Sequence, residues 1–449
     1  MIEKKFTIAG AGLVGSLFAI YLAKKGHKVE VFERRKDMRT ETIGAGKSIN
    51  LALSDRGWKA LAVVGVDDEV RKMAIPMYKR VMHGLDGTLI DQAYGNDGEA
   101  IYSVSRGGLN ALLMDLAERE DKVNFHFDQK CVDVNLKDAK ATFEHTQTNK
   151  LTEVAADHVV GADGIYSAVR TLMQRQDRFN FEQRYIDHGY KELVIPANAD
   201  GTHQLEMNAL HIWPRGTYML IALPNLDGSF TCTLFFPFEG KYSFDSLKND
   251  EAILSFFKEV FPDAVPLMPT LLEDFKENPT SSLGIIRCFP WTVDDKVMLI
   301  GDSSHATVPF YGQGMNSGFE DCSVFNDLME EYGDDWEACF KAYEISRKEN
   351  GDAIQDLSLH NFVVMRDKTA DSKFLLQKKI EKHFSAKHPD KWLPLYSMVT
   401  FSDIPYAEAW RLGQQQEAMM QAIISMPDIE SKWDSIEVEE RMLEMILSK

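Results

Sequence analysis

Three glycines near the N-terminus have the spacing of a dinucleotide-binding turn. Gly10, Gly12 and Gly15 follow an apolar run and open a stretch with helical periodicity. In such a turn the first glycine makes the tight bend, the second lets the backbone approach a pyrophosphate, and the third lets the helix pack closely on the sheet. A second apolar run ends at Glu33, at the distance where a carboxylate binds an adenosine ribose. The pattern predicts a nucleotide site at the start of the chain.

Two later segments place an aspartate between an apolar strand and the start of a helix. They are Asp163 within residues 159–170 and Asp302 within residues 297–306. A helix N-terminus presents unpaired N–H groups to phosphate, and an aspartate just before it can bind ribityl hydroxyls. Taken alone, each aspartate is explained equally well as a turn or capping residue. Together, after a glycine-rich turn, they favour FAD over NAD.

The three segments together resemble the FAD-dependent aromatic hydroxylases typified by para-hydroxybenzoate hydroxylase. Within that group, the chain resembles the kynurenine 3-monooxygenase family through residues 47–54, 76–83, 102–106, 211–215, 308–321 and 394–402. The resemblance implies a flavin monooxygenase of tryptophan degradation that converts L-kynurenine to 3-hydroxy-L-kynurenine with NADPH and O2, through a flavin C4a-hydroperoxide. The expected cofactor contacts come from Gly10, Gly12, Val14, Gly15, Glu33, Arg34, Arg35, Ala52, Arg106, Val132, Asp163, Asp302, Gly314, Met315 and Asn316.

Such a substrate ends in an amino acid, whose carboxylate needs a cation. The planar guanidinium of arginine makes two parallel hydrogen bonds to a carboxylate. Arg80 is our candidate for this role, assisted by Tyr94, Asn361 and Tyr396. The alternative for Arg80 is a solvated charge on a strand, and for Arg106 it is a surface ion pair.

Arg80 is predicted on a strand that Asp86 and Gly87 turn into a hairpin, with residues 88–94 as the return strand. With a plain two-residue turn, alternation along the strands puts Arg80 and Tyr94 on opposite faces of the ribbon. A bulge, a longer turn or a twist is therefore required if both side chains contact one ligand.

Asn361 interrupts an apolar helical stripe that runs through Ile354, Leu357 and Met365. A buried amide needs hydrogen-bond partners, which either another part of the protein or a polar ligand can provide. Tyr396 lies in the apolar run 392–401, and its hydroxyl needs a partner for the same reason. For both residues, packing in the core is the alternative to binding substrate.

Residues 309–316 predict a loop that lies against the flavin ring. Pro309 and Phe310 provide apolar edges that shape the pocket, and Gly314 allows a close approach of the backbone. His305, near this loop, either shuttles a proton or, more simply, caps or packs the helix start. The flavin carries the oxidation, and the aryl amine of kynurenine activates its own ring. We therefore predict no certain catalytic side chain and no metal.

The order of these segments predicts an α/β fold with a discontinuous Rossmann-type FAD-binding domain, formed by residues 1–75, 96–180 and 290–330. A β-sheet substrate domain is expected from residues 76–95 and 181–289, and a helical C-terminal region covering the active site from 331–449. A second dinucleotide fingerprint is missing, which predicts that NADPH binds transiently. The sequence does not reveal the residues that hold NADPH.

Composition excludes several other functions. The formal charge of −19 argues against nucleic acid or an anionic membrane as the main partner. Five cysteines without C-x-x-C spacing predict reduced thiols in a cytoplasmic protein. We further expect a soluble protein that is either a monomer or a homodimer. Residues 436–449 predict an amphipathic helix and not the membrane-anchoring tail of eukaryotic members of the family. The remaining alternatives are a related hydroxylase with another anthranilate-like or phenolic substrate, and a flavin electron carrier.

Overall fold

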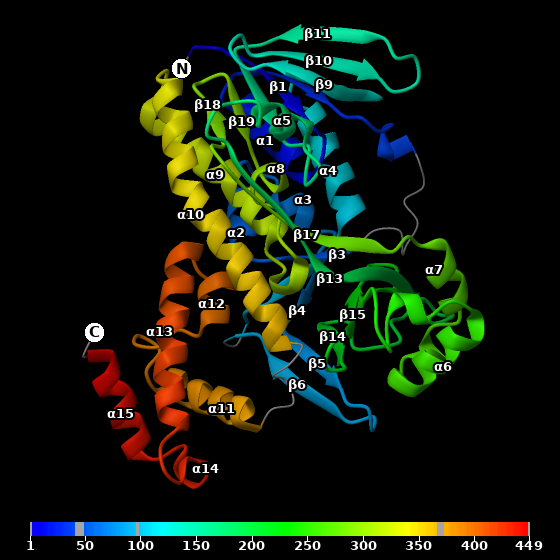
Figure 1. Cartoon of the computed structure of the whole chain (residues 1–449), viewed down its shortest axis with the longest axis vertical. Coiled ribbons are helices and arrows are strands. Elements are labelled where there is room, and N and C mark those ends of the chain that lie inside the picture. Colours follow the sequence, from blue (N-terminus) through cyan, green and yellow to red (C-terminus); the bar gives the residue numbers. More distant parts are fainter. Residues whose placement is uncertain (1, 41–48, 96–97, 366–371, 448–449) are drawn as a thin grey trace.

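The computed structural model describes residues 2–40, 49–95, 98–365 and 372–447. Lys47, Ser48 and the last two residues of the predicted C-terminal helix lie outside this part of the chain. Figure 1 shows three regions: a sheet with helices at the top, a second sheet with its own helices at the right, and a group of helices at the lower left. The mixed α/β architecture confirms the predicted fold class.

A six-stranded sheet brings together strands that lie far apart in the sequence, in the order β18-β19-β12-β1-β2-β8. The central strand β1 pairs in parallel with β2 and with β12, and β12 pairs in parallel with β19. Because parallel strands end at the same edge of a sheet, the turns after β1, β12 and β19 meet there. The strands are β1 (Lys5–Ala9), β2 (Lys28–Phe32), β8 (Val123–His126), β12 (His158–Gly161), β18 (Thr292–Val293) and β19 (Val297–Leu299).

Helices and small sheets surround this sheet. Helix α1 (Leu13–Lys24) is buried along nine of its residues, because its apolar side chains have neighbours on every side. The other elements are η1 (Met38–Thr40), β3 (Asn50–Leu53), α2 (Asp55–Val63), α3 (Asp67–Arg71), β4 (Ile75–Met77), β7 (Ile101–Ser105), α4 (Arg106–Glu118), β9 (Gln129–Asn135), β10 (Lys140–His145), β11 (Leu151–Ala155), α5 (Ala168–Met173), α8 (Asp302–His305), η4 (Pro309–Tyr311), α9 (Gly314–Tyr332) and α10 (Trp336–Val363).

The second large sheet has seven strands in the order β17-β13-β16-β15-β14-β5-β6. Strands β15 and β16 form the expected hairpin, whose turn is closed by a bond from Gly228 N–H to the Asn225 carbonyl. Helices α6 (Asp250–Val260) and α7 (Leu271–Glu277) share an aromatic-rich core with one face. The strands are β5 (Lys79–His83), β6 (Leu89–Ala93), β13 (Asn180–Ile195), β14 (Ala209–Pro214), β15 (Met219–Pro224), β16 (Phe230–Pro237) and β17 (Ser281–Phe289).

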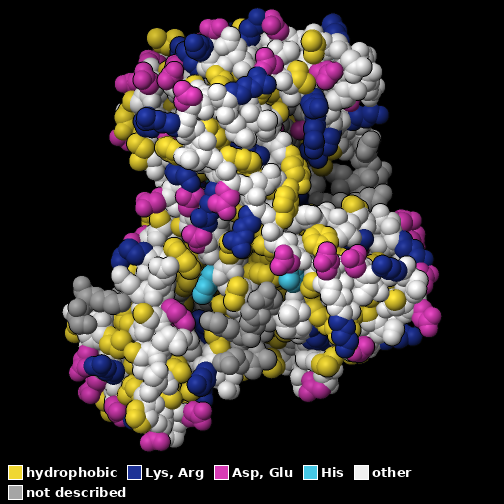
Figure 2. All heavy atoms as spheres, viewed as in Figure 1, with side chains coloured by type: hydrophobic (Ala, Val, Ile, Leu, Met, Phe, Trp, Pro, Cys, Tyr) yellow, Lys and Arg dark blue, Asp and Glu magenta, His cyan; other side chains and the backbone are white. Residues whose placement is uncertain are grey.

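The C-terminal region is helical, as its 3.6-residue periodicity predicts. It contains α11 (Ser372–Lys387), α12 (Leu395–Thr400), α13 (Tyr406–Ile424), α14 (Ile429–Lys432) and α15 (Ile436–Leu447). Helices α11, α13 and α15 share an apolar core that includes Ile380, Met420 and Met442. In the described ranges, no helix is both long and apolar enough to span a bilayer. On the face shown in Figure 2, acidic and basic side chains are mixed over all three regions.

Candidate active site

A cavity of about 410 Å³ lies where the two large sheets and the C-terminal helices meet. This volume suits a small organic molecule, and most of its walls are apolar. The cavity brings together residues from distant parts of the chain. The predicted site residues that line it are Gly12, Val14, Ala52, Arg80, Tyr94, Arg106, Asp302, Pro309, Phe310, Gly314, Met315 and Tyr396.

The glycine-rich turn between β1 and α1 has the geometry that a phosphate requires. A Cβ atom on Gly10, where φ is +106°, would lie 2.4 Å from the Ala162 carbonyl oxygen, and one on Gly15 would lie 2.1 Å from the Gly10 oxygen. Gly12 lines the cavity and has no atom within 4 Å of its Cβ position. Helix α1 has no side-chain cap at its N-terminus. This end of the cavity therefore fits the pyrophosphate of FAD.

The carboxylate of Glu33 is hydrogen-bonded to protein groups near this turn. Its Oε2 accepts from the Ala11 N–H at 3.1 Å, and its Oε1 accepts from the backbone N and Nε of Arg35 at 3.0 and 2.8 Å. Glu33, Arg34, Arg35 and the half-buried Val132 are not in the cavity wall. Their roles as cofactor contacts remain predictions.

The two aspartates of the flavin segments differ in their surroundings. Asp163 caps α5, because its Oδ2 accepts from the N–H groups of Ala168 and Val169 at 2.6 and 3.3 Å. Burial raises the pKa of Asp163. Asp302 is exposed and lines the cavity. Capping accounts for Oδ2 of Asp163, but its buried Oδ1 has no hydrogen-bond partner in the described chain, so its role as a cofactor contact remains a prediction. Asp302 is placed where it can reach a ligand.

Asn316 links two backbone segments of the cavity wall, at Ala52 and Gly312, by hydrogen bonds. Its Oδ1 accepts from the Ser54 N–H at 3.0 Å, and its Nδ2 donates to the carbonyls of Ala52 and Gly312, both at 2.9 Å. The side chain is completely buried. Asn316 therefore fixes two backbone segments that line the cavity, and its amide makes no contact with the cavity itself.

Arg80 lies at the opposite end of the cavity, beside two tyrosines that stack on each other with centroids 5.5 Å apart. Its guanidinium carbon is 4.6 Å from the ring centroids of both Tyr94 and Tyr396. Tyr396 also stacks on Tyr311, with centroids 5.5 Å apart. No carboxylate of the described chain forms an ion pair with Arg80, whose guanidinium interacts instead with the hydroxyls of Tyr94 and Tyr396. This end of the cavity presents a cation and a polar hydroxyl to an anionic group.

The β5–β6 hairpin explains how both side chains reach one site. Arg80 pairs with Gln92, so Tyr94, two residues further on, faces the same side as Arg80. The connection is longer than the two-residue turn expected at Asp86 and Gly87, because Gly84 N–H donates to the Thr88 carbonyl at 2.8 Å. This longer connection is one of the three alternatives that contact with one ligand required, and it shifts the register by one residue relative to a plain turn at Asp86 and Gly87.

Asn361 supports the cavity from outside its wall. Its Nδ2 donates to the Phe310 carbonyl at 2.7 Å, and the side chain does not line the cavity. Phe310 stacks on Phe362 with centroids 4.3 Å apart and also contacts Phe235. The amide thus has a protein partner, as the packing alternative requires, and it sets the position of the Phe310 backbone.

His305 is buried away from the cavity. Its Nε2 lies 2.6 Å from Asp321 Oδ2, and its ring stacks on Trp291. These contacts correspond to the packing role and not to a proton shuttle in the cavity.

Several cavity residues were not singled out from the sequence. Tyr311 belongs to the stack around Arg80, and Thr307 has a buried hydroxyl without a hydrogen-bond partner in the described chain. The sheet contributes side chains at alternating positions, as half-buried strands do. This alternation along β15 and β16 could have indicated from the sequence which side chains face the cavity, namely Met219, Ile221, Leu223, Thr233 and Phe235.

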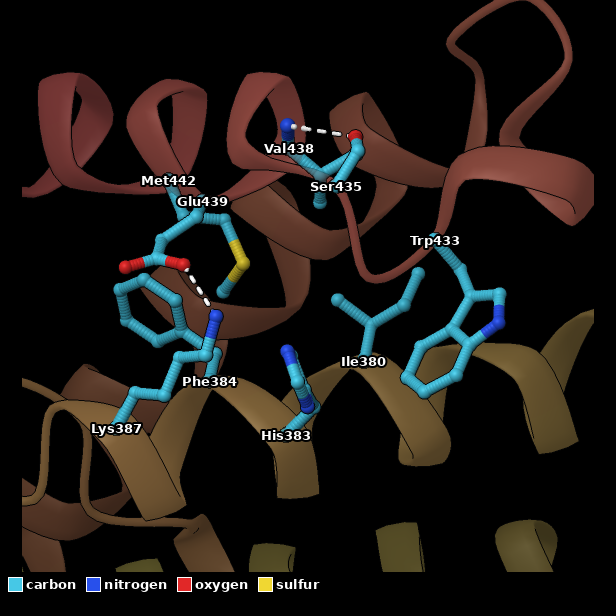
Figure 3. Close-up of a pocket in the computed structure, with 9 residues that line it drawn as sticks. All are labelled: Ile380, His383, Phe384, Lys387, Trp433, Ser435, Val438, Glu439 and Met442. Atoms are coloured by element: carbon cyan, nitrogen blue, oxygen red, sulfur yellow. Dashed lines mark hydrogen bonds and ion pairs between the residues drawn. The ribbon is translucent and has the colours of Figure 1, made fainter.

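A second, much smaller cavity lies between α11 and the last helix. Figure 3 shows Ile380 and Met442 facing each other across it, and Glu439 reaching Lys387. The Lys387 Nζ to Glu439 Oε2 distance is 2.7 Å. Its volume of about 10 Å³ holds at most one water molecule, so it is a packing gap and not a binding site.

Comparison with known proteins identifies close relatives. A family model described as an FAD binding domain matches residues 3–253 and 262–358. Kynurenine 3-monooxygenase from Flavobacterium johnsoniae is 56% identical over 442 residues, which cover 98% of each chain. The enzyme of the same name from Dictyostelium discoideum is 43% identical over 95% of each chain.

Solved structures with lower identity share the fold. The 2-methyl-3-hydroxypyridine-5-carboxylic acid oxygenase aligns with a TM-score of 0.67 at 21% identity, over 84% of this chain and 96% of its own. Pseudomonas aeruginosa PqsL, in complex with 2-aminobenzoylacetate, aligns with a TM-score of 0.65 at 19% identity, over 81% and 97%. At these identities the likeness concerns the fold alone. Because the match to the curated relatives extends over nearly the full length of both chains, the protein belongs to the kynurenine 3-monooxygenase family.

Proposed function

We infer that the protein hydroxylates L-kynurenine to 3-hydroxy-L-kynurenine, using FAD, NADPH and O2. The observation that carries this proposal is the guanidinium of Arg80, which pairs with no carboxylate among the described residues and lies at the end of an apolar cavity whose other end has the geometry of a flavin site. A zwitterionic side chain on an aromatic ring matches the cation at one end and the apolar middle of this cavity. The relatives carry the same name over the full length.

At the cofactor end, Gly12, the N-terminus of α1 and Asp302 would hold FAD, with Met315 beside it. When bound, FAD accepts a hydride from NADPH and activates dioxygen. We propose that residues 1–75, 96–180 and 290–330 form the domain that binds it, with 76–95 and 181–289 as the substrate domain. Five buried, free cysteines fit a reducing compartment such as the cytoplasm.

At the substrate end, Arg80 binds the carboxylate through two N–H donors. The oxygen of the Tyr94 hydroxyl accepts from Arg80, so its O–H is free to donate one hydrogen bond to the substrate. Burial raises the pKa of Tyr94, so this hydroxyl keeps its proton and acts as a donor. Tyr396 packs beside the guanidinium and stacks on Tyr94. These contacts fix the aromatic ring of the substrate in the apolar middle of the cavity.

Pro309 and Phe310 close the cavity beside the expected position of the flavin ring. Their apolar surfaces exclude water, and Asn361 holds the loop through the Phe310 carbonyl. The substrate supplies its own electron density through the aryl amine, so the site requires no protein base to ionise it. The protein contributes orientation, dryness and charge complementarity.

The test measures NADPH oxidation by the purified yellow protein in air, with and without L-kynurenine. Acceleration by L-kynurenine together with formation of 3-hydroxykynurenine is the expected result. Acceleration by anthranilate or phenolic compounds alone would assign another hydroxylase activity, and oxidation indifferent to every aromatic compound would assign an electron carrier. Protein that neither contains nor takes up FAD would reject the proposal.

A further inference from the structure

A chain of buried charged side chains begins at the turn that carries Asp302. Asp321 on α9 accepts from the Gly301 N–H at 2.9 Å through its Oδ2, which also contacts His305. Its Oδ1 accepts from Arg347 Nε on α10 at 2.7 Å. Asp321 is completely buried, and Arg347 is 3% exposed. Asp321 thus connects the turn at Gly301 and Asp302, called the cofactor turn below, to helices α9 and α10.

Glu320 extends this chain to helix α2. Its Oε2 pairs with Arg347 Nη1 at 2.7 Å, and its Oε1 pairs with Arg56 Nη1 at 2.5 Å. Although burial alone raises the pKa of Glu320, the two guanidinium groups keep it below its ordinary value. The carboxylate is therefore ionised and bridges Arg347 and Arg56.

The remaining donors of Arg56 bind the backbone of the C-terminal region. Nε donates to the Val399 carbonyl at 3.1 Å, and Nη2 donates to the carbonyls of Met398 and Ile404. The guanidinium carbon also lies 4.1 Å from the Tyr406 ring centroid. The last carbonyls of a helix have no partner within that helix, and Met398 and Val399 are near the end of α12. Arg56 therefore caps α12 from another region of the molecule.

Tyr396 lies in the first turn of the same helix. Because α12 has only six residues, a displacement of its C-terminal end moves Tyr396 as well. We propose that Arg56 is a positioning residue for the reaction: it holds α12 so that Tyr396 covers Arg80, and through Glu320, Arg347 and Asp321 it links this placement to the cofactor turn. The proposal rests on the proposed function, because Tyr396 acts there on the substrate.

The contacts of Arg56 argue for positioning more than for stability. Buried ion pairs are weak evidence of stabilisation, because desolvation offsets much of their attraction. Three of its donors reach backbone carbonyls of one short segment, which defines the place of that segment without regard to its side chains. Figure 1 shows α12 beside α10, the helix that carries Arg347.

The chain offers a matched control on the same two elements. Lys59, also on α2, pairs with Asp403 in the same C-terminal segment at 2.9 Å, but the two side chains are 60% and 71% exposed. Exposed pairs of this kind contribute little. Replacing Lys59 by methionine removes one α2 contact to the segment and leaves the buried one.

The experiment compares Arg56→Met with Lys59→Met in the FAD-loaded enzyme. We expect Arg56→Met to keep its FAD, to raise the KM for L-kynurenine at least tenfold and to release more hydrogen peroxide per NADPH. Lys59→Met stays within twofold of wild type. In the double variant Arg56→Met/Tyr396→Ala, which removes the ring that Arg56 is proposed to place, the KM rises by less than the product of the single effects. A KM and coupling equal to those of Lys59→Met, or multiplicative effects in the double variant, would overturn the proposal.

A second readout does not depend on turnover. Amide hydrogen exchange of residues 395–404 is expected to speed up at least tenfold in Arg56→Met and to stay unchanged in Lys59→Met. Arg56→Lys, which keeps the charge facing Glu320 but has fewer donors in a different geometry, is expected to accelerate this exchange less and serves if the methionine variant does not fold. Unchanged exchange in both Arg56 variants rejects the positioning role. Wild-type enzyme that fails to hydroxylate L-kynurenine rejects the proposed function instead.

Discussion

The guanidinium of Arg80 and the ring of Tyr94 lie on one face of the β5–β6 ribbon, 4.6 Å apart. Tyr396 approaches from the C-terminal helices at the same distance. The two rings stack on each other with centroids 5.5 Å apart, so the guanidinium lies beside the pair. A cation next to two aromatic rings, with no carboxylate of the described chain paired to it, is stabilised by the rings but keeps a strong preference for an anion. The arrangement makes Arg80 the residue whose loss is expected to affect substrate binding most.

Arg80→Ala is expected to raise the KM for L-kynurenine by the equivalent of about 2 to 4 kcal/mol, because the substrate carboxylate then lacks its charged partner in a shielded site. FAD content stays at the wild-type level. Arg80→Lys rescues poorly, since an ammonium group does not reproduce the two parallel hydrogen bonds. Steady-state kinetics and flavin absorbance measure both effects. An alanine variant with a KM within about twofold of wild type would remove Arg80 from the site.

Asp302→Ala is expected to lose most of its FAD, because the exposed carboxylate faces the cavity after β19. Asp163→Ala is expected instead to lower the free energy of unfolding by about 1 kcal/mol, as the loss of a helix cap does. The flavin-to-protein absorbance ratio and thermal unfolding separate the two effects. Asp295→Ala, at a half-buried position that is paired with Lys296 and lies outside the cavity wall, serves as the control. Full FAD occupancy in Asp302→Ala would contradict the assignment.

The sequence predicted the parts of the site that depend on local pattern. The glycine turn before α1 and the alternation in β15 and β16 are properties of short segments, and the structure contains them. The register of the β5–β6 hairpin was not predictable in the same way. The pair Asp86 and Gly87 is typical of a two-residue turn, but the hydrogen bond from Gly84 N–H to the Thr88 carbonyl shows that the turn is longer.

Partners of buried polar groups were also beyond the sequence. Periodicity placed Asn361 on an apolar stripe, but both a ligand and the Phe310 carbonyl would satisfy its amide equally. Arg56 and Glu320 are 264 positions apart, and neither has a local motif that indicates the other. Such pairs depend on how whole regions pack against each other, which local spacing does not encode.

Glu192→Gln is expected to stabilise the protein at alkaline pH. Burial raises the pKa of Glu192 on β13 from 4.5 to about 7, although Arg106 and the backbone of Ile49 lower it. A carboxyl group whose pKa is higher in the folded than in the unfolded protein makes its full contribution to stability at pH values below the unfolded-state pKa. This contribution is lost as the pH rises through the folded-state pKa of about 7. Because Glu192 is only partly buried, we expect Glu192→Gln to raise the free energy of unfolding by about 1 to 2 kcal/mol at pH 8. No increase is expected near pH 4.5.

Unfolding of wild type, Glu192→Gln and Glu182→Gln at pH 5 and pH 8 measures this effect. Glu182 is exposed on the same strand and serves as the control. A gain of equal size at both pH values would show that the glutamine acts through packing and not through the charge of Glu192.

Phe310→Ala is expected to bind FAD and oxidise NADPH, yet to release more hydrogen peroxide and less hydroxylated product per NADPH. Phe310 lines the cavity and packs on Phe362 and Phe235, so its removal opens an apolar wall and lets water reach the reacting oxygen. Tyr396→Phe uncouples more mildly, because it keeps the ring that covers Arg80 and loses only a hydroxyl. Peroxide and product are quantified in the same reaction, with wild type as the reference. If both variants stay fully coupled while they turn over slowly, these residues act by positioning the substrate and not by excluding water.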